Sequence, residues 1–162
     1  MSDYLKPALA VALPNLGGLA GVPINRRNRA QWFDLLKKPA WKPPDRVFAP
    51  MWTFLYSSMG YASYLVWRDG GGFSGAAMKP LTVYGAQLVL NWAWTPIFFG
   101  LRSLKWGLVE MVGLWGAVAA TIYTFYPVSR VAAGLLVPYL GWLTLATTLT
   151  YTMWRDNKAR AE

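Results

Sequence analysis

Residues 80–101 read PLTVYGAQLVLNWAWTPIFFGL, and no charged side chain occurs between Lys79 and Arg102. A helix needs about 20 predominantly apolar residues to cross the roughly 30 Å of hydrocarbon in a bilayer. This run is long enough, and its backbone N–H and C=O groups would have to be paired within the segment in lipid, which favours a helix. The stretch therefore predicts a membrane-spanning helix, although it also carries an asparagine and two tryptophans.

Four further windows of the same kind occupy most of the remaining chain. Residues 7–25, 47–67 and 131–154 contain no charge, and residues 106–129 contain only Glu110. A water-soluble bundle is disfavoured because five such windows leave little polar surface to face water. We therefore predict an all-α membrane protein, a single membrane domain over residues 1–162 that forms a five-transmembrane-helix bundle. The expected spans are about residues 5–25, 47–67, 80–101, 106–129 and 131–154, with a cytosolic loop at 26–46.

The basic residues are distributed unevenly between the two ends of such a bundle. The net charge is +9, from 16 Lys and Arg against seven Asp and Glu. The end that holds the N-terminus has four of the basic residues, and the end that holds the 26–46 loop and the C-terminus has the other 12. The positive-inside rule places the second end, with the C-terminus, in the cytosol. The charge is thus a topology signal and a contact for lipid headgroups, and without a nucleic-acid-binding motif it predicts no nucleic-acid partner.

The residue types exclude several kinds of chemistry. The chain has no histidine and no cysteine, so the commonest metal ligands and general bases are absent, and we expect no metal and no bound cofactor. Acid–base or nucleophilic catalysis has no evident machinery, and a channel or secondary transporter would need a polar path or internal repeats. Glu110 is the one carboxylate inside a window; an acid within a span is a candidate functional residue, and an ion pair with Lys105 or Arg102 is the alternative.

The ten tryptophans allow two interpretations. An aromatic belt at the headgroup level explains those at span ends, which are Trp67, Trp106 and Trp154. A cavity for a planar apolar ligand, which needs flat aromatic walls and a few polar groups, explains the more deeply placed ones better. On the fourth span we expect the cavity face to contain Trp106, Val109, Glu110 and Gly113. The other spans offer these residues to the same cavity: Phe48, Ala49, Met51 and Trp52 on the second, Asn91, Trp92 and Trp94 on the third, and Trp142, Ala146 and Leu149 on the fifth.

Three smaller features of the sequence predict a buried hydrogen bond, a short helix in the loop and a dimer contact. A buried amide in lipid is favourable when it is hydrogen-bonded to a neighbouring helix, which is the role expected for Asn91. The segment 28–36 could form a short amphipathic helix before a proline-rich stretch. Small residues at Thr82, Gly85 and Ala86 indicate a face for a homodimer contact.

Five motifs in order give the sequence a family resemblance. They are KKPAWKPP (37–44), GYASYLVW (60–67), LNWAWTPIFFG (90–100), LLVPYLGWLTLATTLTY (135–151) and WRDN (154–157). Together they resemble the translocator protein family, whose bacterial members are called tryptophan-rich sensory proteins and whose animal members are called peripheral-type benzodiazepine receptors. The wording of the motifs is more similar to the animal branch.

The resemblance implies a five-helix bundle, often dimeric, with a pocket that opens under the first loop. It implies a receptor or transport protein that binds porphyrins such as protoporphyrin IX, isoquinoline and benzodiazepine ligands, and cholesterol. For the animal branch it implies the mitochondrial outer membrane, with a bacterial envelope as the alternative. By motif position the resemblance implies that the ligand contacts Trp52, Trp94, Trp106, Trp142, Ala146 and Leu149, and with Ala49 these are the seven candidate ligand-binding residues. Its sterol site would correspond to Leu149, Tyr151 and Arg155, which fit a Leu–Tyr–Arg consensus. Some bacterial members promote light-dependent porphyrin breakdown, so an enzyme that uses Trp52 and Trp142 is the alternative function.

Overall fold

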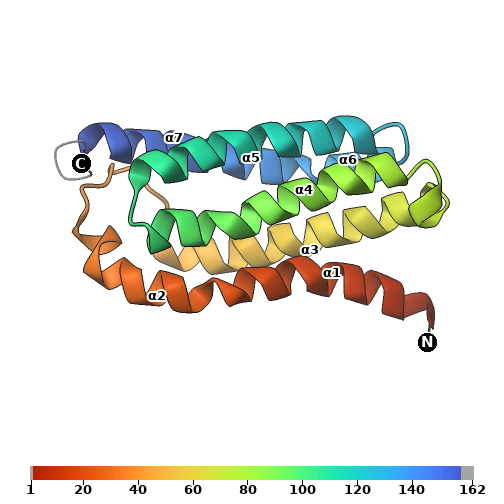
Figure 1. Ribbon diagram of the computed structural model, residues 1–162, viewed down its shortest axis with the longest axis horizontal. Helices are drawn as coiled ribbons and strands as arrows, with labels where there is room; N and C mark the ends of the chain where they lie inside the picture. The colour runs from red at the N-terminus through yellow and green to blue at the C-terminus, as the bar shows by residue number, and fades with distance from the viewer. Residues whose placement is uncertain (1, 158–162) are drawn as a thin grey trace.

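The computed structural model describes residues 2–157, and all regular secondary structure within that range is helical (Figure 1). Ten helical segments follow one another along the described part of the chain. They are α1 (Ser2–Ala20), α2 (Val22–Gln31), η1 (Phe33–Leu35), α3 (Asp45–Asp69), η2 (Gly72–Ser74), α4 (Met78–Thr95), η3 (Pro96–Gly100), α5 (Leu104–Phe125), α6 (Arg130–Leu135) and α7 (Val137–Asp156).

These elements form five long rods that lie side by side. The first rod is α1 continued by α2, the second is α3, the third is α4 continued by η3, the fourth is α5, and the fifth is α6 continued by α7. The main packing pairs are α1 with α3, α4 with α5, α5 with α7, and α3 with α6. In Figure 1 the N-terminus, the α3–α4 connection and the α5–α6 connection lie at one end, and the α2–α3 loop lies at the other.

The helix boundaries follow local chemistry. Ser103 and Ser129 cap α5 and α6, because each hydroxyl oxygen accepts a hydrogen bond from a backbone N–H three residues later. The predicted span 131–154 is divided at Leu136, which we did not expect. The cause is Pro138, whose ring has no N–H and disfavours a continuous helix through the preceding turn.

The third rod ends in a π-helical turn. In η3 the N–H of Leu101 bonds to the carbonyl of Pro96 and that of Ser103 bonds to Phe98, a spacing of five residues at 3.1 and 3.2 Å. A π turn holds more chain per turn than an α-helix. Both Phe98 and Phe99 are thereby buried.

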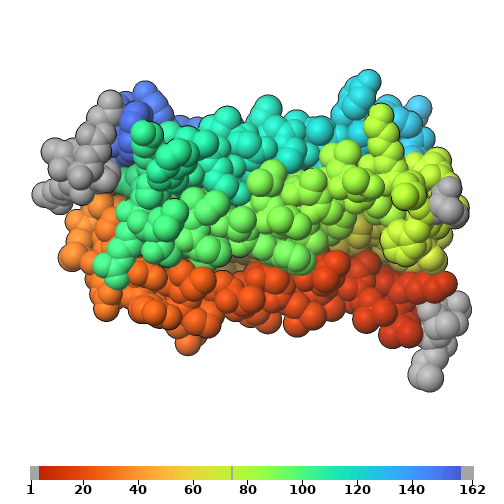
Figure 2. All heavy atoms as spheres, in the orientation of Figure 1, coloured from red at the N-terminus to blue at the C-terminus, as the bar shows by residue number. Residues whose placement is uncertain are grey.

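Three helical segments of the described chain are long and apolar enough to cross a membrane. They are Tyr4–Leu35, Leu104–Phe125 and Arg130–Asp156. The rods of α3 and α4 are not among these segments, because their indole, phenol and amide side chains, such as Trp52, Tyr56 and Gln87, lower the mean hydropathy. The outer side of α1 is a row of exposed leucines, and Figure 2 shows the α1–α2 rod along one side of the molecule.

The first rod lies close to the second and third because of glycine. A Cβ at Gly60 would meet the backbone of Ala10 and Val11, so α3 touches the main chain of α1 directly. A Cβ at Gly17 would overlap the indole of Trp92, whose N–H donates to the Pro14 carbonyl at 3.3 Å. Glycine is therefore required where α1 joins the bundle.

The predicted cytosolic loop 26–46 is partly helical. The amphipathic helix expected at 28–36 is wrong in its bounds, because α2 ends at Gln31 and a separate short turn, η1, follows. Phe33 and Leu36 are buried while Leu35 is exposed. The loop is attached to the end of α7 by Asn157, whose side chain accepts from the Lys37 N–H at 2.9 Å and donates to the Lys37 carbonyl at 2.8 Å.

Candidate ligand-binding cavity

A cavity of about 570 Å³ lies inside the bundle, near the end that carries the α2–α3 loop. Every rod contributes to its wall, and the loop residues Phe33 and Lys42 close one end. Most of its lining is aromatic or aliphatic. The charged lining residues, Arg29, Lys42 and Asp45, lie together at the loop end. The cavity is thus mainly apolar, with uncharged polar groups such as Asn91 in its wall and charged groups at its rim.

The structure brings six of the seven candidate residues to this cavity. They are Ala49, Trp52, Trp94, Trp142, Ala146 and Leu149. Trp106 lies outside it with 55% of its surface exposed. The α5 face that lines the cavity is Met111 and Leu114, whereas Val109 and Gly113 face outward. The expected face of α5 was therefore wrong. The buried face of this helix is shifted by one residue along the sequence from the expected one. It contains Leu104, Gly107, Met111, Leu114 and Val118.

Aromatic rings form the cavity walls in pairs. Trp94 stacks on Phe98 with ring centroids 4.6 Å apart and planes 14° from parallel. Phe48 meets Trp142 edge-on at 5.4 Å. The indole nitrogens of Trp94 and Trp142 are buried and have no hydrogen-bond partner among residues 2–157. These two N–H groups are therefore available to an acceptor on a bound molecule.

A chain of hydrogen bonds joins three rods beside the cavity. The Tyr56 hydroxyl donates to the Asn91 side-chain oxygen at 2.6 Å, and the Asn91 amide nitrogen donates to the Tyr139 hydroxyl at 2.7 Å. Tyr139 in turn donates to the side-chain oxygen of Gln87 at 2.9 Å. The bonding expected of Asn91 is confirmed, and Gln87 and Tyr139 were missed. They could have been found by the argument used for Asn91, because each is a polar group within an apolar window.

The cavity rim is held by ion pairs that link the loop to α2 and α3. The Asp45 carboxylate contacts the Arg29 guanidinium and the Lys42 ammonium, each at 2.6 Å. The hydrogen bond from Lys42 lowers the pKa of Asp45 below its ordinary value, against the effect of burial. Burial lowers the pKa of Lys38 in the same loop. The ion pairs of Asp45 with Arg29 and Lys42 thus help to fix the loop against α2 and α3.

Comparison with known proteins identifies the relatives of this chain. The TspO/MBR family model matches residues 10–155. The human Translocator protein is 50% identical over 152 residues, which cover 93% of this chain and 90% of the human protein. The Bos taurus Translocator protein is 49% identical over 148 residues, 91% and 88% of the two chains. The Tryptophan-rich sensory protein of Cereibacter sphaeroides is 42% identical over 133 residues, 82% and 80% of the two chains.

The chain belongs to the TspO/MBR family. It is a membrane protein of this family, as the family match and its apolar helices together show. Its identity is higher to these two mammalian proteins than to the bacterial one, in keeping with the animal-like wording of the motifs.

In this TspO/MBR protein the residues implied for a sterol do not share one surface. Leu149 is buried, with 7% of its surface exposed, and lines the inner cavity. Tyr151 is 47% exposed and packs against Trp154, with ring centroids 6.1 Å apart. Arg155 bonds to Asp156 at 3.2 Å and is also exposed. Tyr151 and Arg155 face away from the cavity. They follow Leu149 by two and six residues, which places them on another side of the helix.

The acidic residue of α5 in this TspO/MBR protein does not form the expected ion pair. Both carboxylate oxygens of Glu110 are buried and have no partner within residues 2–157. Arg102 instead donates to Asn28 at 2.7 Å and to Gln31, and the Lys105 ammonium lies over the Trp106 ring at 5.6 Å. Among the described residues no group of three or more His, Cys, Asp or Glu could hold a metal ion.

Proposed function

We propose that this TspO/MBR protein is a multi-pass membrane receptor or transport protein that binds a porphyrin such as protoporphyrin IX in the inner cavity. The observation that carries the proposal is the convergence of Trp52, Trp94 and Trp142 from three rods on one cavity of about 570 Å³. Pockets for drug-sized ligands have this size, are mainly apolar and aromatic, and hold a few convergent polar groups. A flat ring system fits walls made of indoles.

The distribution of polar groups supports a planar ligand with an acidic edge. The cavity wall offers the indole N–H groups of Trp94 and Trp142, which have no hydrogen-bond partner among residues 2–157. The rim offers two cations, Arg29 and Lys42, against one carboxylate, Asp45. A porphyrin would bury its ring against the indoles and direct its carboxylates to the rim. Neutral isoquinoline and benzodiazepine ligands would use the apolar wall and the indole N–H groups alone.

The proposal includes five membrane spans, with the α2–α3 loop and the C-terminus on the cytosolic side. The family match and the three strongly apolar segments support membrane insertion, and α3 and α4 lie packed between them. The excess of basic residues at the loop end supports the orientation. The two final basic residues in that count, Lys158 and Arg160, lie outside the described residues. The animal-like motifs favour the mitochondrial outer membrane over a bacterial envelope.

Cholesterol and a second copy of the chain are the further partners that we propose. A sterol would lie against the outer face of α7 at Tyr151 and Arg155, since Leu149 faces the inner cavity. A second copy would contact α4 at Gly85, where a Cβ would meet open space. The exposed Thr82 hydroxyl bonds to its own helix at Met78, so it needs no other partner at a dimer contact.

Ligand titration tests the cavity proposal. Protoporphyrin IX should quench the tryptophan fluorescence of the purified protein in the dark, and a labelled isoquinoline should compete with it. Trp142→Ala should weaken both ligands by about 5- to 150-fold, since loss of one stacked ring removes about 1–3 kcal/mol. Trp106→Ala is the matched control, because that indole lies outside the cavity. Equal weakening by both variants, or no saturable quenching, would refute the proposal.

Light-dependent porphyrin breakdown is the second candidate function. It is favoured by the contacts of Trp52, whose ring lies 5.4 Å from Tyr56 and 6.3 Å from Tyr139, so that oxidisable side chains adjoin the cavity. Illumination of the complex in air should then cause a lasting loss of porphyrin absorbance. Trp52→Phe and Trp142→Phe should each slow that loss while dark binding persists. Bleaching at an unchanged rate in both variants would assign it to the free porphyrin.

A further inference from the structure

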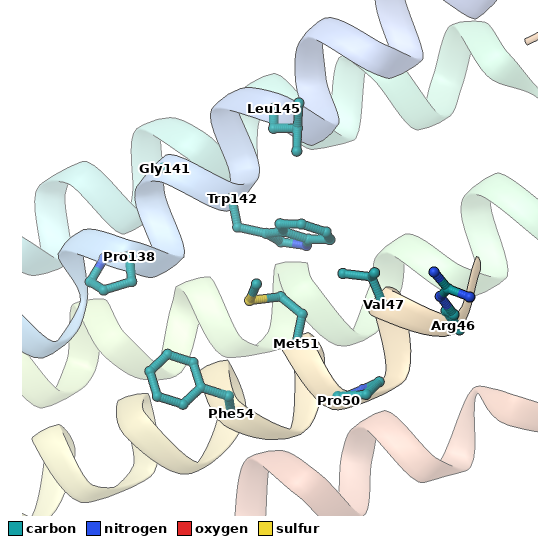
Figure 3. Close-up of a pocket in the computed structure, with 9 residues that line it drawn as sticks. All are labelled: Arg46, Val47, Pro50, Met51, Phe54, Pro138, Gly141, Trp142 and Leu145. Carbon is teal, nitrogen blue, oxygen red and sulfur yellow. The ribbon is translucent and has the colours of Figure 1, made fainter. Parts of the chain in front are cut away.

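A second hollow lies on the outside of the bundle, between α3 and α7 (Figure 3). It is an open groove of about 820 Å³ and differs from the inner cavity in all its lining residues except Trp142. We call it the side groove. Its α3 wall consists of Arg46, Val47, Pro50, Met51 and Phe54, and its α7 wall consists of Pro138, Gly141, Trp142 and Leu145.

The side groove exists because α3 and α7 contact each other only sparsely. Gly141 contributes no side chain on this side of α7, and a Cβ placed there would have nothing within 4 Å. The α3 wall runs from Arg46 to Phe54, a length of about 12 Å at the rise of an α-helix. The groove is therefore a long apolar trough that follows the helix direction.

Among the residues that line the side groove only Arg46 is charged, and it lies at one end of the groove. Arg46 is exposed and forms no hydrogen bond or ion pair among residues 2–157, whereas its neighbour Asp45 is already paired with Arg29 and Lys42. In Figure 3 the Arg46 guanidinium lies at the end of the groove, and Phe54 lies toward the other end. If α3 spans the membrane as proposed above, Arg46 lies at headgroup depth and the rest of the groove faces hydrocarbon.

We propose that the side groove binds an anionic membrane phospholipid, with its phosphate at Arg46 and one acyl chain along α3 and α7. An apolar trough of this shape accepts a hydrocarbon chain, and an unpaired cation at its end selects a negative headgroup. A sterol fits less well, because its neutral hydroxyl leaves the arginine charge unmatched. Trp142 would then separate the lipid from the ligand in the inner cavity, since its indole forms a wall of both spaces.

Native mass spectrometry of the purified protein with added phosphatidylglycerol or phosphatidylcholine of identical acyl chains tests the site. The wild-type protein should hold one phosphatidylglycerol more tightly than phosphatidylcholine. Arg46→Gln should weaken phosphatidylglycerol about fivefold, the effect of one basic residue near an anionic headgroup, and should weaken phosphatidylcholine less, because the choline cation offsets the attraction of its phosphate to the arginine. Gly141→Leu should displace both lipids, because the new side chain fills the groove.

Two matched controls separate the groove from general attraction to lipid. Lys105→Gln removes a cation that lies over Trp106 on α5, a helix that does not line the groove. Gly113→Leu fills another glycine site with open space, also on α5. Neither control should change lipid retention. An equal loss from Lys105→Gln and Arg46→Gln, or unchanged retention in Gly141→Leu, would overturn the proposal, as would sterol binding that depends on Gly141 in place of phospholipid.

Porphyrin titration of the same samples separates this inference from the proposed function on which it rests. Saturable porphyrin quenching without selective lipid retention would refute the side groove alone. Selective retention of phosphatidylglycerol without porphyrin binding would refute the proposed porphyrin site in the inner cavity and leave the lipid proposal standing. A change of oligomeric state in Gly141→Leu, with no change in bound lipid, would assign the groove to a second copy of the chain and overturn the lipid proposal.

Discussion

The hydrogen-bond chain beside the inner cavity makes the stability of the bundle depend on one amide. Asn91 joins α4 to α3 through Tyr56 and to α7 through Tyr139, with bonds of 2.6 and 2.7 Å. An interhelical side-chain hydrogen bond in a membrane protein contributes about 0.6 kcal/mol on average and about 1.7 kcal/mol at most. Asn91→Leu removes two of them, so the free energy of unfolding should fall by about 1–3 kcal/mol.

The assay is reversible unfolding in mixed micelles, followed by helical circular dichroism as the denaturing detergent is increased. Tyr139→Phe and the double variant complete a mutant cycle, and the two changes should be coupled by at least about 0.5 kcal/mol because they remove a shared bond. Thr148→Val is the control, since that exposed hydroxyl bonds only within its own helix, to Thr144 at 2.9 Å. A cost for Asn91→Leu no larger than the control's, or strictly additive effects, would refute the reasoning.

Three further predictions concern packing, the loop and its charges. Gly60→Ala puts a Cβ against the backbone of Ala10 and should cost about 1–3 kcal/mol in chemical unfolding, whereas Gly134→Ala, which meets open space, should be neutral or stabilising by up to about 1 kcal/mol; equal effects would contradict the close approach of α1 and α3. Asn157→Ala removes the bonds to Lys37, so limited trypsin digestion should cut the loop after Lys37 several times faster than in wild type; unchanged cleavage would show that other contacts hold the loop. Because the folded pKa of Asp45 lies below its ordinary value of 3.8, its stabilising contribution is present above that value and is lost as the pH falls through the lower folded value. The difference in stability between wild type and Asp45→Asn should accordingly be constant above about pH 5 and shrink at lower pH; a difference that stays constant down to acid unfolding would contradict this.

The long helices could be predicted because charged residues flank each apolar window of the sequence. Lys79 and Arg102, for example, bracket the rod formed by α4 and η3 within a few residues. The break at Leu136 was not predicted, although Pro138 carries the signal for it. The end of α2 at Gln31 depends on tertiary contacts of Phe33 and Leu36 that no local pattern contains.

The candidate site was predictable where a residue lay deep within a span and not where the choice was between faces of a helix. Depth and the family resemblance together separated Trp94 and Trp142 from the tryptophans at span ends, whereas Trp92, which is equally deep, packs against α1 and does not line the cavity. On α5 the apolar residues occur on all sides, so the sequence did not distinguish Val109 from Met111, and the wrong face was chosen. The side groove was not predictable either, since it depends on the spacing of α3 and α7.

The π-helical turn at Pro96–Gly100 has a consequence for how the length of this chain can vary. Loss of one residue within that turn can be absorbed by tightening it to an α-helix, which leaves the register of the flanking residues intact. Loss of one residue between Met78 and Asn91 would instead rotate the earlier part of the helix by about 100° relative to the later part. An evolutionary gap or an engineered deletion in this rod is therefore tolerable at its last turn, and natural variants that differ in length here can keep the same interior.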